Sequence, residues 1–193
     1  MYDLDTERLR LTPFNMAHLD ALHALWTDPD VRRYLWDGEV ISRERAAEVI
    51  TDSERNFAER GYGFWAMMLR GEFDAEAGAG DGAEASELVG FCGYRVFEDS
   101  GEPELLYGVL PRYWGKGLVS EAGHAVIRDG FERNGFTRII AATDTPNQSS
   151  VQVMRRLGMV FLRRGEFHGL DTVFYELTPE DYAAQLELST MRS

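Results

Sequence analysis

Residues 109–118 read VLPRYWGKGL, and this stretch decides how the rest of the chain is interpreted. It joins a predicted strand that ends at Leu110 to a predicted helix that begins near Gly117. A turn that contains glycine at such a junction points several backbone N–H groups at one place, and the helix dipole adds partial positive charge there. The stretch therefore predicts a binding site for an anion such as a pyrophosphate.

Two common phosphate-binding motifs do not fit this stretch. A Walker A loop would need glycine where Leu110 stands and serine or threonine where Gly117 stands. A dinucleotide-binding fingerprint would need a third glycine in place of Ser120. The residues alone leave open whether the glycines help to bind an anion or only form a tight turn.

Hydrophobic periodicity on both sides of the turn predicts a mixture of strands and helices. Strands are predicted over residues 8–13, 62–70, 88–97, 104–110, 138–144, 159–164 and 172–177, and helices over 16–28, 42–61, 117–136, 149–158 and 178–189. Some neighbouring strands are linked by hairpins and others by helices. This order predicts an α/β protein, of the α+β type, with a mixed sheet.

The length of 193 residues and the hydrophobic fraction of 44% predict one domain with a sizeable core. We expect residues 1–193 to form that single domain. Residues 71–87 are small and acidic and show no periodicity. They predict a flexible acidic loop inserted between two strands.

The charge balance and the apolar pattern exclude several classes of function. The chain has 33 acidic and 20 basic side chains, a net charge of −13, which disfavours nucleic-acid binding and favours cationic amines. No run of about 18 apolar residues exists to span a membrane. Cys92 is the only cysteine, so no internal disulfide can form, which fits a reducing compartment and predicts a cytoplasmic protein. Cys92 itself is expected in the core. No cluster has metal-ligand spacing, so no metal is expected.

Two motifs resemble one family. Residues 112–117, RYWGKG, resemble the Arg/Gln-x-x-Gly-x-Gly/Ala acyl-CoA loop of the GNAT superfamily of N-acetyltransferases. Residues 147–150, NQSS, followed by VQVMRRLGM, resemble the Asn-x-x-Ser…Leu-Gly-Phe segment of its ribosomal-protein N-terminal acetyltransferase-like branch. The opening LDTERLRLTPF also fits that branch. The resemblance covers the chain from about residue 4 to about residue 178, which is the expected core of the domain. The resemblance implies the GNAT fold, a mixed twisted sheet of about six to seven strands with helices on both faces.

The resemblance also implies residues that bind acetyl-CoA, the expected cosubstrate. The backbone of Val109 and Leu110 would pair with the pantetheine arm, at a splay between their strand and the strand over 138–144. The pyrophosphate would be held by the amides of Trp114, Gly115, Lys116, Gly117, Leu118 and Val119. Arg112 either reinforces this binding or is solvated, and Trp114 is expected to pack the turn onto the sheet. Asn147 either hydrogen-bonds the pantetheine arm or only caps the next helix.

Three residues are candidates for proton transfer. An alkylammonium must lose a proton before it attacks a thioester. Glu104 is the first candidate for a base acting through water, unless it is merely an edge carboxylate beside Pro103, and His168 is the second. Ser150 would lie near the thioester sulfur, or it is only a first-turn residue. Many GNAT enzymes protonate the leaving thiolate with a tyrosine at the position of Met154, which cannot donate a proton.

The acceptor side is predicted from the connection between the first two helices. Trp36, Asp37 and Glu39 lie there, in a segment that resembles the acceptor-facing loop of the branch. Their carboxylates would suit a cationic acceptor, unless they only solvate the connection. The resemblance implies direct attack of an amine, from a small molecule or a protein N-terminus, on acetyl-CoA in a ternary complex, and the chain could be a homodimer. The alternative is a non-catalytic acyl-CoA-binding or regulatory module on the same fold.

Overall fold

The computed structural model describes residues 2–70, 87–98 and 100–190. The chain forms two compact units, Met1–Gly93 with Tyr107–Val126, and Tyr94–Leu106 with Ile127–Ser193. Within the described ranges no helix has the length and apolar character needed to cross a membrane. Of the predicted acidic loop, residues 71–86 lie outside the described part of the chain. Glu87 belongs to the folded structure, because its carbonyl oxygen accepts a hydrogen bond from the Leu69 amide at 3.2 Å.

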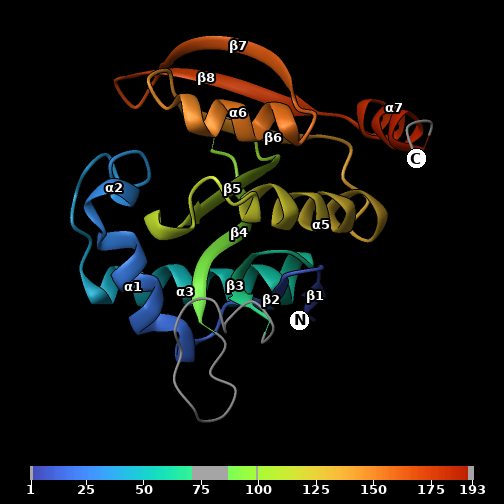
Figure 1. The fold of residues 1–193 in the computed structure, drawn as a ribbon. Coiled ribbons are helices and arrows are strands. Elements are labelled where there is room, and N and C mark those ends of the chain that lie inside the picture. The colour runs from blue at the N-terminus through green and yellow to red at the C-terminus, as the bar shows by residue number, and fades with distance from the viewer. Residues whose placement is uncertain (1, 71–86, 99, 191–193) are drawn as a thin grey trace. The chain divides into compact units, whose positions relative to one another are not determined.

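The strands and helices follow the predicted order closely (Figure 1). They are β1 (Leu4–Asp5), β2 (Leu9–Pro13), η1 (Met16–His18), α1 (Leu19–Thr27), α2 (Pro29–Arg32), α3 (Arg43–Arg60), β3 (Phe64–Leu69), β4 (Leu88–Val96), β5 (Pro103–Val109), η3 (Pro111–Tyr113), α5 (Leu118–Glu132), β6 (Ile139–Asp144), α6 (Gln148–Arg156), β7 (Val160–Phe167), β8 (Leu170–Leu177) and α7 (Pro179–Thr190). The hydrogen-bonded strand order is β1-β2-β3-β4-β5-β6-β8-β7. β5 and β6 pair in parallel, whereas β2–β3, β3–β4, β6–β8 and β7–β8 pair antiparallel. The prediction of an α/β protein with a mixed sheet is confirmed.

Three details differ from the expectations. Among the described residues the sheet has eight strands, one more than the seven predicted. The additional strand is β1, which has only two residues, pairs with β2 and carries no periodicity that could reveal it. The helix predicted over 16–28 begins instead with the 3₁₀ turn η1 before α1. The short helix α2 was not predicted; Asp28 caps it with a side chain that accepts from the Asp30 and Val31 amides.

The first unit is built on the predicted amphipathic faces. On β2, Leu9 and Leu11 are fully buried and Arg10 between them is exposed, as the alternation requires. The buried face of α1 consists of Leu19, Leu22, Leu25 and Trp26, which recur at helical spacing within the predicted helix 16–28. This helix contacts α3 (Figure 1).

The expected ends of α3 are confirmed by the cap geometry. The Ser42 hydroxyl accepts a hydrogen bond from the Arg45 amide at 3.1 Å, so it satisfies one of the free amides of the first turn. Gly61 has a φ of +84° and ends the helix in the left-handed conformation.

Close approach of β4 to β5 fixes the strand that leads into the 109–118 stretch. A Cβ atom at Gly108 would lie 2.6 Å from the Phe91 ring, and one at Gly90 would lie 2.3 Å from the Gly108 carbonyl oxygen. Phe91 in turn makes edge contacts with Trp26 and Phe64. The end of β5 is therefore held on a rigid aromatic cluster.

The second unit contains β6, β8 and β7 in that order, and α6 lies along β6 (Figure 1). Its apolar core includes Phe97, Ile140 and Phe174. β7 and β8 form a hairpin whose two central residues, His168 and Gly169, have φ values of +50° and +80°. Positive φ at both positions is the type I′ geometry that matches the twist of the strands.

Candidate functional site

The turn between β5 and α5, residues 111–117, is here called the Gly-Lys-Gly turn. It starts with η3 and ends where α5 begins at Leu118. Gly115 and Gly117 have φ values of +75° and +78°, which explains why glycine stands at both positions. The predicted strand–turn–helix arrangement is therefore present.

Part of the Gly-Lys-Gly turn uses its own amides internally. The Trp114 amide donates to the Pro111 carbonyl at 3.0 Å, and the Lys116 amide donates to Tyr113 at 3.4 Å. In the described part of the chain, no acceptor pairs with the amides of Gly115, Gly117, Leu118 or Val119. These four are the donors that remain available for an anion, at the positive end of a 15-residue helix.

The side chains of the turn do not all lie as expected. Trp114 is 53% exposed, and its indole N–H donates to the carbonyl of Val109, the last residue of β5, at 3.0 Å, so the side chain is tied to the sheet by this bond while about half of it faces solvent. Arg112 is not simply solvated, because it forms an ion pair with Glu87. The Lys116 ammonium lies 5.0 Å from the centre of the buried Tyr113 ring, a cation–π contact.

The backbone of Val109 and Leu110 is largely satisfied within the first unit. The Leu110 amide donates to Val89 at 2.9 Å, and the Leu110 carbonyl accepts from Tyr113 at 2.9 Å. The Val109 carbonyl accepts from Trp114. These bonds reduce the number of backbone groups of Val109 and Leu110 that could pair with a pantetheine arm.

The expected acceptor loop is a compact turn folded on Arg32. The amides of Trp36 and Gly38 both donate to the Arg32 carbonyl at 3.1 Å, and the Arg32 guanidinium donates to the Gly38 carbonyl. Asp37 has a φ of +53°, and both Asp37 and Glu39 are exposed. The Trp36 ring packs edge-on against Trp26 at 5.9 Å. The two carboxylates are thus presented to solvent, and the aromatic ring anchors the turn.

Glu104 is a buried carboxylate and not an edge residue. Its strand β5 lies between β4 and β6, and the residue is 3% exposed, so the edge alternative is wrong. Arg95 donates to Glu104 Oε2 at 2.5 Å. Burial raises the pKa of Glu104 above the ordinary value, and the Arg95 charge opposes but does not cancel that shift. A carboxylate with a raised pKa is suited to accept a proton.

His168, the second candidate base, lies at the tip of the β7–β8 hairpin. Its Nε2 is 3.2 Å from Glu98 Oε2, and both side chains are more than half exposed. The Glu98 charge also acts to raise the pKa of Glu104, so Glu98 is a shared neighbour of both candidates. His168 has a left-handed backbone conformation because the tight turn requires a positive φ at this position.

Asn147 and Ser150 meet at the start of α6. The Asn147 side-chain oxygen accepts from the Ser150 amide at 3.2 Å, and its Nδ2 donates to Thr143 Oγ1 at 3.0 Å. The expected N-cap role of Asn147 is therefore confirmed. Met154, on the same helix, is fully buried, so the structure gives that position a packing role.

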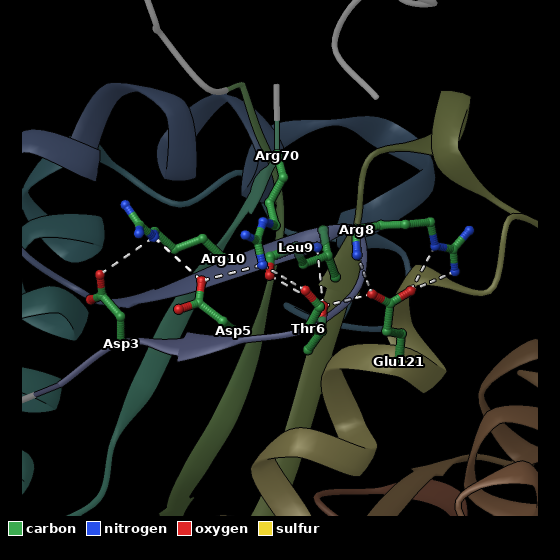
Figure 2. Close-up of polar contacts among 8 residues, drawn as sticks. All are labelled: Asp3, Asp5, Thr6, Arg8, Leu9, Arg10, Arg70 and Glu121. Carbon is green, nitrogen blue, oxygen red and sulfur yellow. Dashed lines mark hydrogen bonds and ion pairs between the residues drawn. The ribbon is translucent and has the colours of Figure 1, made fainter. Parts of the chain in front are cut away.

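Two residues with long-range contacts near the Gly-Lys-Gly turn were not singled out from the sequence. Arg8, at the entry to β2, forms an ion pair with Glu121 in the first turn of α5 at 2.6 Å (Figure 2). The same guanidinium donates to the Lys116 carbonyl at 2.9 Å. In the sequence, Arg8 belongs to the alternating segment 8–13, which predicts only that its side chain lies on an exposed face of a strand. No local pattern indicates that its partner is Glu121, 113 positions away.

Cysteine chemistry is not supported by the structure. Cys92 is fully buried on β4, and burial raises the pKa of its thiol to about 12. A thiol held in this way stays protonated and is a poor nucleophile. Its expected place in the core is confirmed. Across the residues that the structure describes, no group of three His, Cys, Asp or Glu side chains is arranged to hold a metal ion.

The mixed sheet and the strand–turn–helix arrangement at residues 109–118 are the features that the family comparison tests. The family model of the Acetyltransferase (GNAT) domain matches residues 8–160. The chain belongs to this family and is an N-acetyltransferase; its family uses acetyl-CoA.

Three comparisons illustrate the relationship. The chain is 24% identical over 192 residues to the N-acetyltransferase p20 of Bacillus licheniformis, a match that covers 95% of this chain and 99% of p20. An acetyltransferase structure from Agrobacterium tumefaciens superposes with a TM-score of 0.75 at 21% identity, covering 92% of this chain and 94% of that one. The ribosomal alpha-N-protein acetyltransferase RimL, solved in complex with coenzyme A, has a TM-score of 0.72 at 18% identity, with 92% and 98% coverage. The two structural matches show the shared fold.

Proposed function

We propose that this N-acetyltransferase moves the acetyl group of acetyl-CoA to a primary amine by direct attack in a ternary complex. The Gly-Lys-Gly turn and the start of α5 carry the proposal. Among the described residues no acceptor pairs with the amides of Gly115, Gly117, Leu118 and Val119, so these amides can donate to the oxygens of a pyrophosphate. The family match spans residues 8–160 and so includes parts of both compact units, which supports a single acetyltransferase domain.

The other contacts to acetyl-CoA are assigned from the chemistry of each residue. Lys116 adds a positive charge to the turn from its position over the Tyr113 ring. Arg112 is neutralised by its ion pair with Glu87. We therefore assign it a weaker role, because Arg112 would have to break this ion pair before it could contact a phosphate. Val109 offers its amide to the pantetheine arm. Asn147 has spare hydrogen-bonding capacity beyond its cap and its bond to Thr143, and that capacity suits a pantetheine amide.

Glu104 is assigned as the general base. An ammonium acceptor must lose a proton before its nitrogen can attack the thioester carbonyl. The pKa of the Glu104 carboxyl is raised, so it lies closer to the pKa of the ammonium whose proton Glu104 must accept. Because the carboxylate is buried, a water molecule is the expected relay.

Ser150 is assigned as the group that assists the leaving thiolate. Its amide is held by Asn147 in the first turn of α6, which fixes the position of the residue. Met154 cannot take this role, because a thioether has no proton to give and the side chain is buried.

The acceptor is proposed to be a cationic amine. The chain carries a net charge of −13, and Asp37 and Glu39 are exposed on the loop that also carries Trp36. Both a small amine and a protein N-terminus satisfy this chemistry. The RimL structure is that of a ribosomal alpha-N-protein acetyltransferase, which supports including N-terminal peptides among the acceptors tested.

The function is tested by release of free thiol from acetyl-CoA in the presence of a panel of amines and N-terminal peptides. We expect release that depends on the acceptor, with cationic acceptors preferred and their KM rising with ionic strength because the attraction is screened. Binding of acetyl-CoA without thiol release from any acceptor would instead support the non-catalytic module.

Ser150→Ala is expected to lower turnover with acetyl-CoA, by less than the roughly 10²–10⁴-fold of a complete acid–base loss, because coenzyme A thiolate is a fair leaving group. The defect should shrink with phenyl thioacetate, whose thiol is more acidic and needs less assistance. The measurement is the ratio of wild-type to variant rate for each thioester. Ser149→Ala is the matched control, since Ser149 is exposed on the same helical turn; a Ser150→Ala defect equal for both thioesters would contradict the assignment.

A further inference from the structure

We propose that Arg8 is a positioning residue for the acetyl donor, which it serves by holding the Gly-Lys-Gly turn and by neutralising Glu121. This inference rests on the proposed binding of the donor pyrophosphate at that turn. Arg8 itself is not assigned any contact with the donor. All the residues involved lie within the first compact unit.

The Arg8 guanidinium joins the turn to the first turn of α5 (Figure 2). Its Nε donates to Glu121 Oε2 at 2.7 Å, and its Nη2 lies 2.6 Å from the same oxygen. Its Nη1 donates to the Lys116 carbonyl at 2.9 Å. The side chains of Arg8 and Glu121 are 28% and 17% exposed, so the pair is largely shielded from solvent. One planar group thus fixes both ends of the segment from Lys116 to Glu121.

The bond to the Lys116 carbonyl determines where the Gly117 amide points. The carbonyl and the following N–H of a trans peptide lie in one plane and point in opposite directions. When Arg8 holds the Lys116 oxygen on its own side, the Gly117 N–H is directed to the opposite side. That amide is one of the unpaired donors assigned to the pyrophosphate. Arg8 therefore fixes the direction of a donor that it does not touch.

Neutralisation of Glu121 is the second effect of Arg8. Glu121 lies in the first turn of α5, close to the amides that would receive the anion. Its Oε1 accepts from the Thr6 hydroxyl at 2.6 Å and from the Arg8 amide at 2.8 Å, and its Oε2 is held by the guanidinium. Without Arg8 a carboxylate would remain uncompensated beside the pyrophosphate, and two negative groups repel each other.

The turn between β1 and β2 is built so that Arg8 stays in place. The Thr6 hydroxyl accepts from the Leu9 amide at 3.0 Å, which closes this turn, and Arg70 donates to the Thr6 carbonyl at 2.9 Å (Figure 2). Arg10, two residues further along in β2, forms ion pairs with Asp3 and Asp5 (Figure 2). It provides a matched control, because it carries the same charge and its ion pairs are made with the N-terminal residues and not with Glu121.

The test compares two donors, acetyl-CoA and acetyl-pantetheine, which lacks the pyrophosphate. Arg8→Gln is expected to raise the KM for acetyl-CoA by about 10-fold or more, the usual size for loss of a charged hydrogen bond. Its kcat/KM for acetyl-pantetheine should stay within about twofold of wild type, since that donor does not use the turn. Arg10→Gln should match wild type with both donors, which excludes an effect of net charge.

A second variant separates the two effects of Arg8. In the double variant Arg8→Gln with Glu121→Gln, the uncompensated carboxylate is gone, so the KM for acetyl-CoA should recover part of the loss seen in Arg8→Gln alone. If Arg8→Gln proves unstable, Arg8→Lys serves in its place. Lysine keeps the charge beside Glu121 but cannot reach Glu121 and the Lys116 carbonyl with one planar fork, so an intermediate KM is expected.

Two results would overturn the inference. One is a wild-type KM for acetyl-CoA in Arg8→Gln, and the other is an equal loss with both donors, which would mean a general structural role. Failure of the proposed function gives a different result, because wild-type protein would then release no thiol from either donor with any acceptor. Wild-type data alone reveal that failure, whereas failure of the inference about Arg8 appears only in the comparison of Arg8→Gln with wild type.

Discussion

Glu104→Gln is expected to lower turnover by about 10²–10⁴-fold near neutral pH, the usual contribution of a general base. The amide has nearly the shape of the carboxyl but cannot accept the ammonium proton. The KM for acetyl-CoA should stay close to wild type, because the proposed pyrophosphate contacts are backbone amides of the Gly-Lys-Gly turn. Steady-state kinetics with the best acceptor from the amine panel checks both quantities.

The pH dependence of kcat/KM identifies the base more sharply than one rate does. Burial raises the pKa of Glu104, so the wild-type rate should fall on the acid side at a pH above the ordinary range of a glutamate. Arg95→Gln should move this fall to still higher pH, because the Arg95 charge acts to lower the pKa. Should Glu104→Gln keep full activity across pH while His168→Ala loses it, His168 is the base instead.

Thermal unfolding of the same variant serves as the folding control. The pKa of Glu104 is raised in the folded state, so the folded protein binds its proton more tightly than the unfolded chain does. Stability from this group is therefore fully present at pH below the ordinary glutamate value and is lost as pH rises through the raised value. At pH 7, Glu104→Gln should consequently melt no lower than wild type, which would separate a catalytic defect from unfolding.

Local patterns in the sequence predicted the features of the fold that depend on near neighbours. The helices predicted over 16–28 and 42–61 and the N-cap at Asn147 each follow from residues within a few positions of one another. The glycines of the 109–118 stretch belong to the same class, because positive φ at Gly115 and Gly117 is a local backbone requirement. The candidate site could be proposed from the sequence because its glycines are a local feature of this kind.

Contacts between distant segments could not be predicted in the same way. The Arg8–Glu121 pair, the Arg112–Glu87 pair and the short strand β1 exist only because the fold brings separate parts of the first unit together. Burial of a charged residue could not be predicted from the sequence either. Glu104 follows Pro103, and proline within a sheet is typical of edge strands, but the structure places Glu104 on an interior strand. Charge patterns alone do not tell a solvated side chain from one with a remote partner.

Gly117→Asp is expected to abolish the stabilisation that acetyl-CoA gives the native protein. A ligand at 100 times its Kd stabilises by about 2.7 kcal/mol, which for a chain of this size corresponds to about 5–10 °C in Tm. The new carboxylate would add negative charge at the residue whose amide is assigned to the pyrophosphate. Its Cβ would lie 3.6 Å from Arg8 Nη2, where the carboxylate competes with Glu121 for the guanidinium that holds the turn. Melting curves with and without acetyl-CoA measure the effect.

Two matched variants separate charge at the turn from backbone strain. Gly117→Ala introduces the strain of a side chain at a φ of +78°, about 1–2 kcal/mol, without the charge, so it should keep a reduced ligand-induced shift. Gly135→Asp adds the same charge at a φ of +64°, where a Cβ has no neighbour within 4 Å, so it should lose stability but keep the full shift. If Gly117→Asp also kept the full shift, the pyrophosphate would have to bind elsewhere than at the start of α5. The expected order of ligand-induced shifts, Gly135→Asp above Gly117→Ala above Gly117→Asp, follows only if the anion lies against the Gly117 amide.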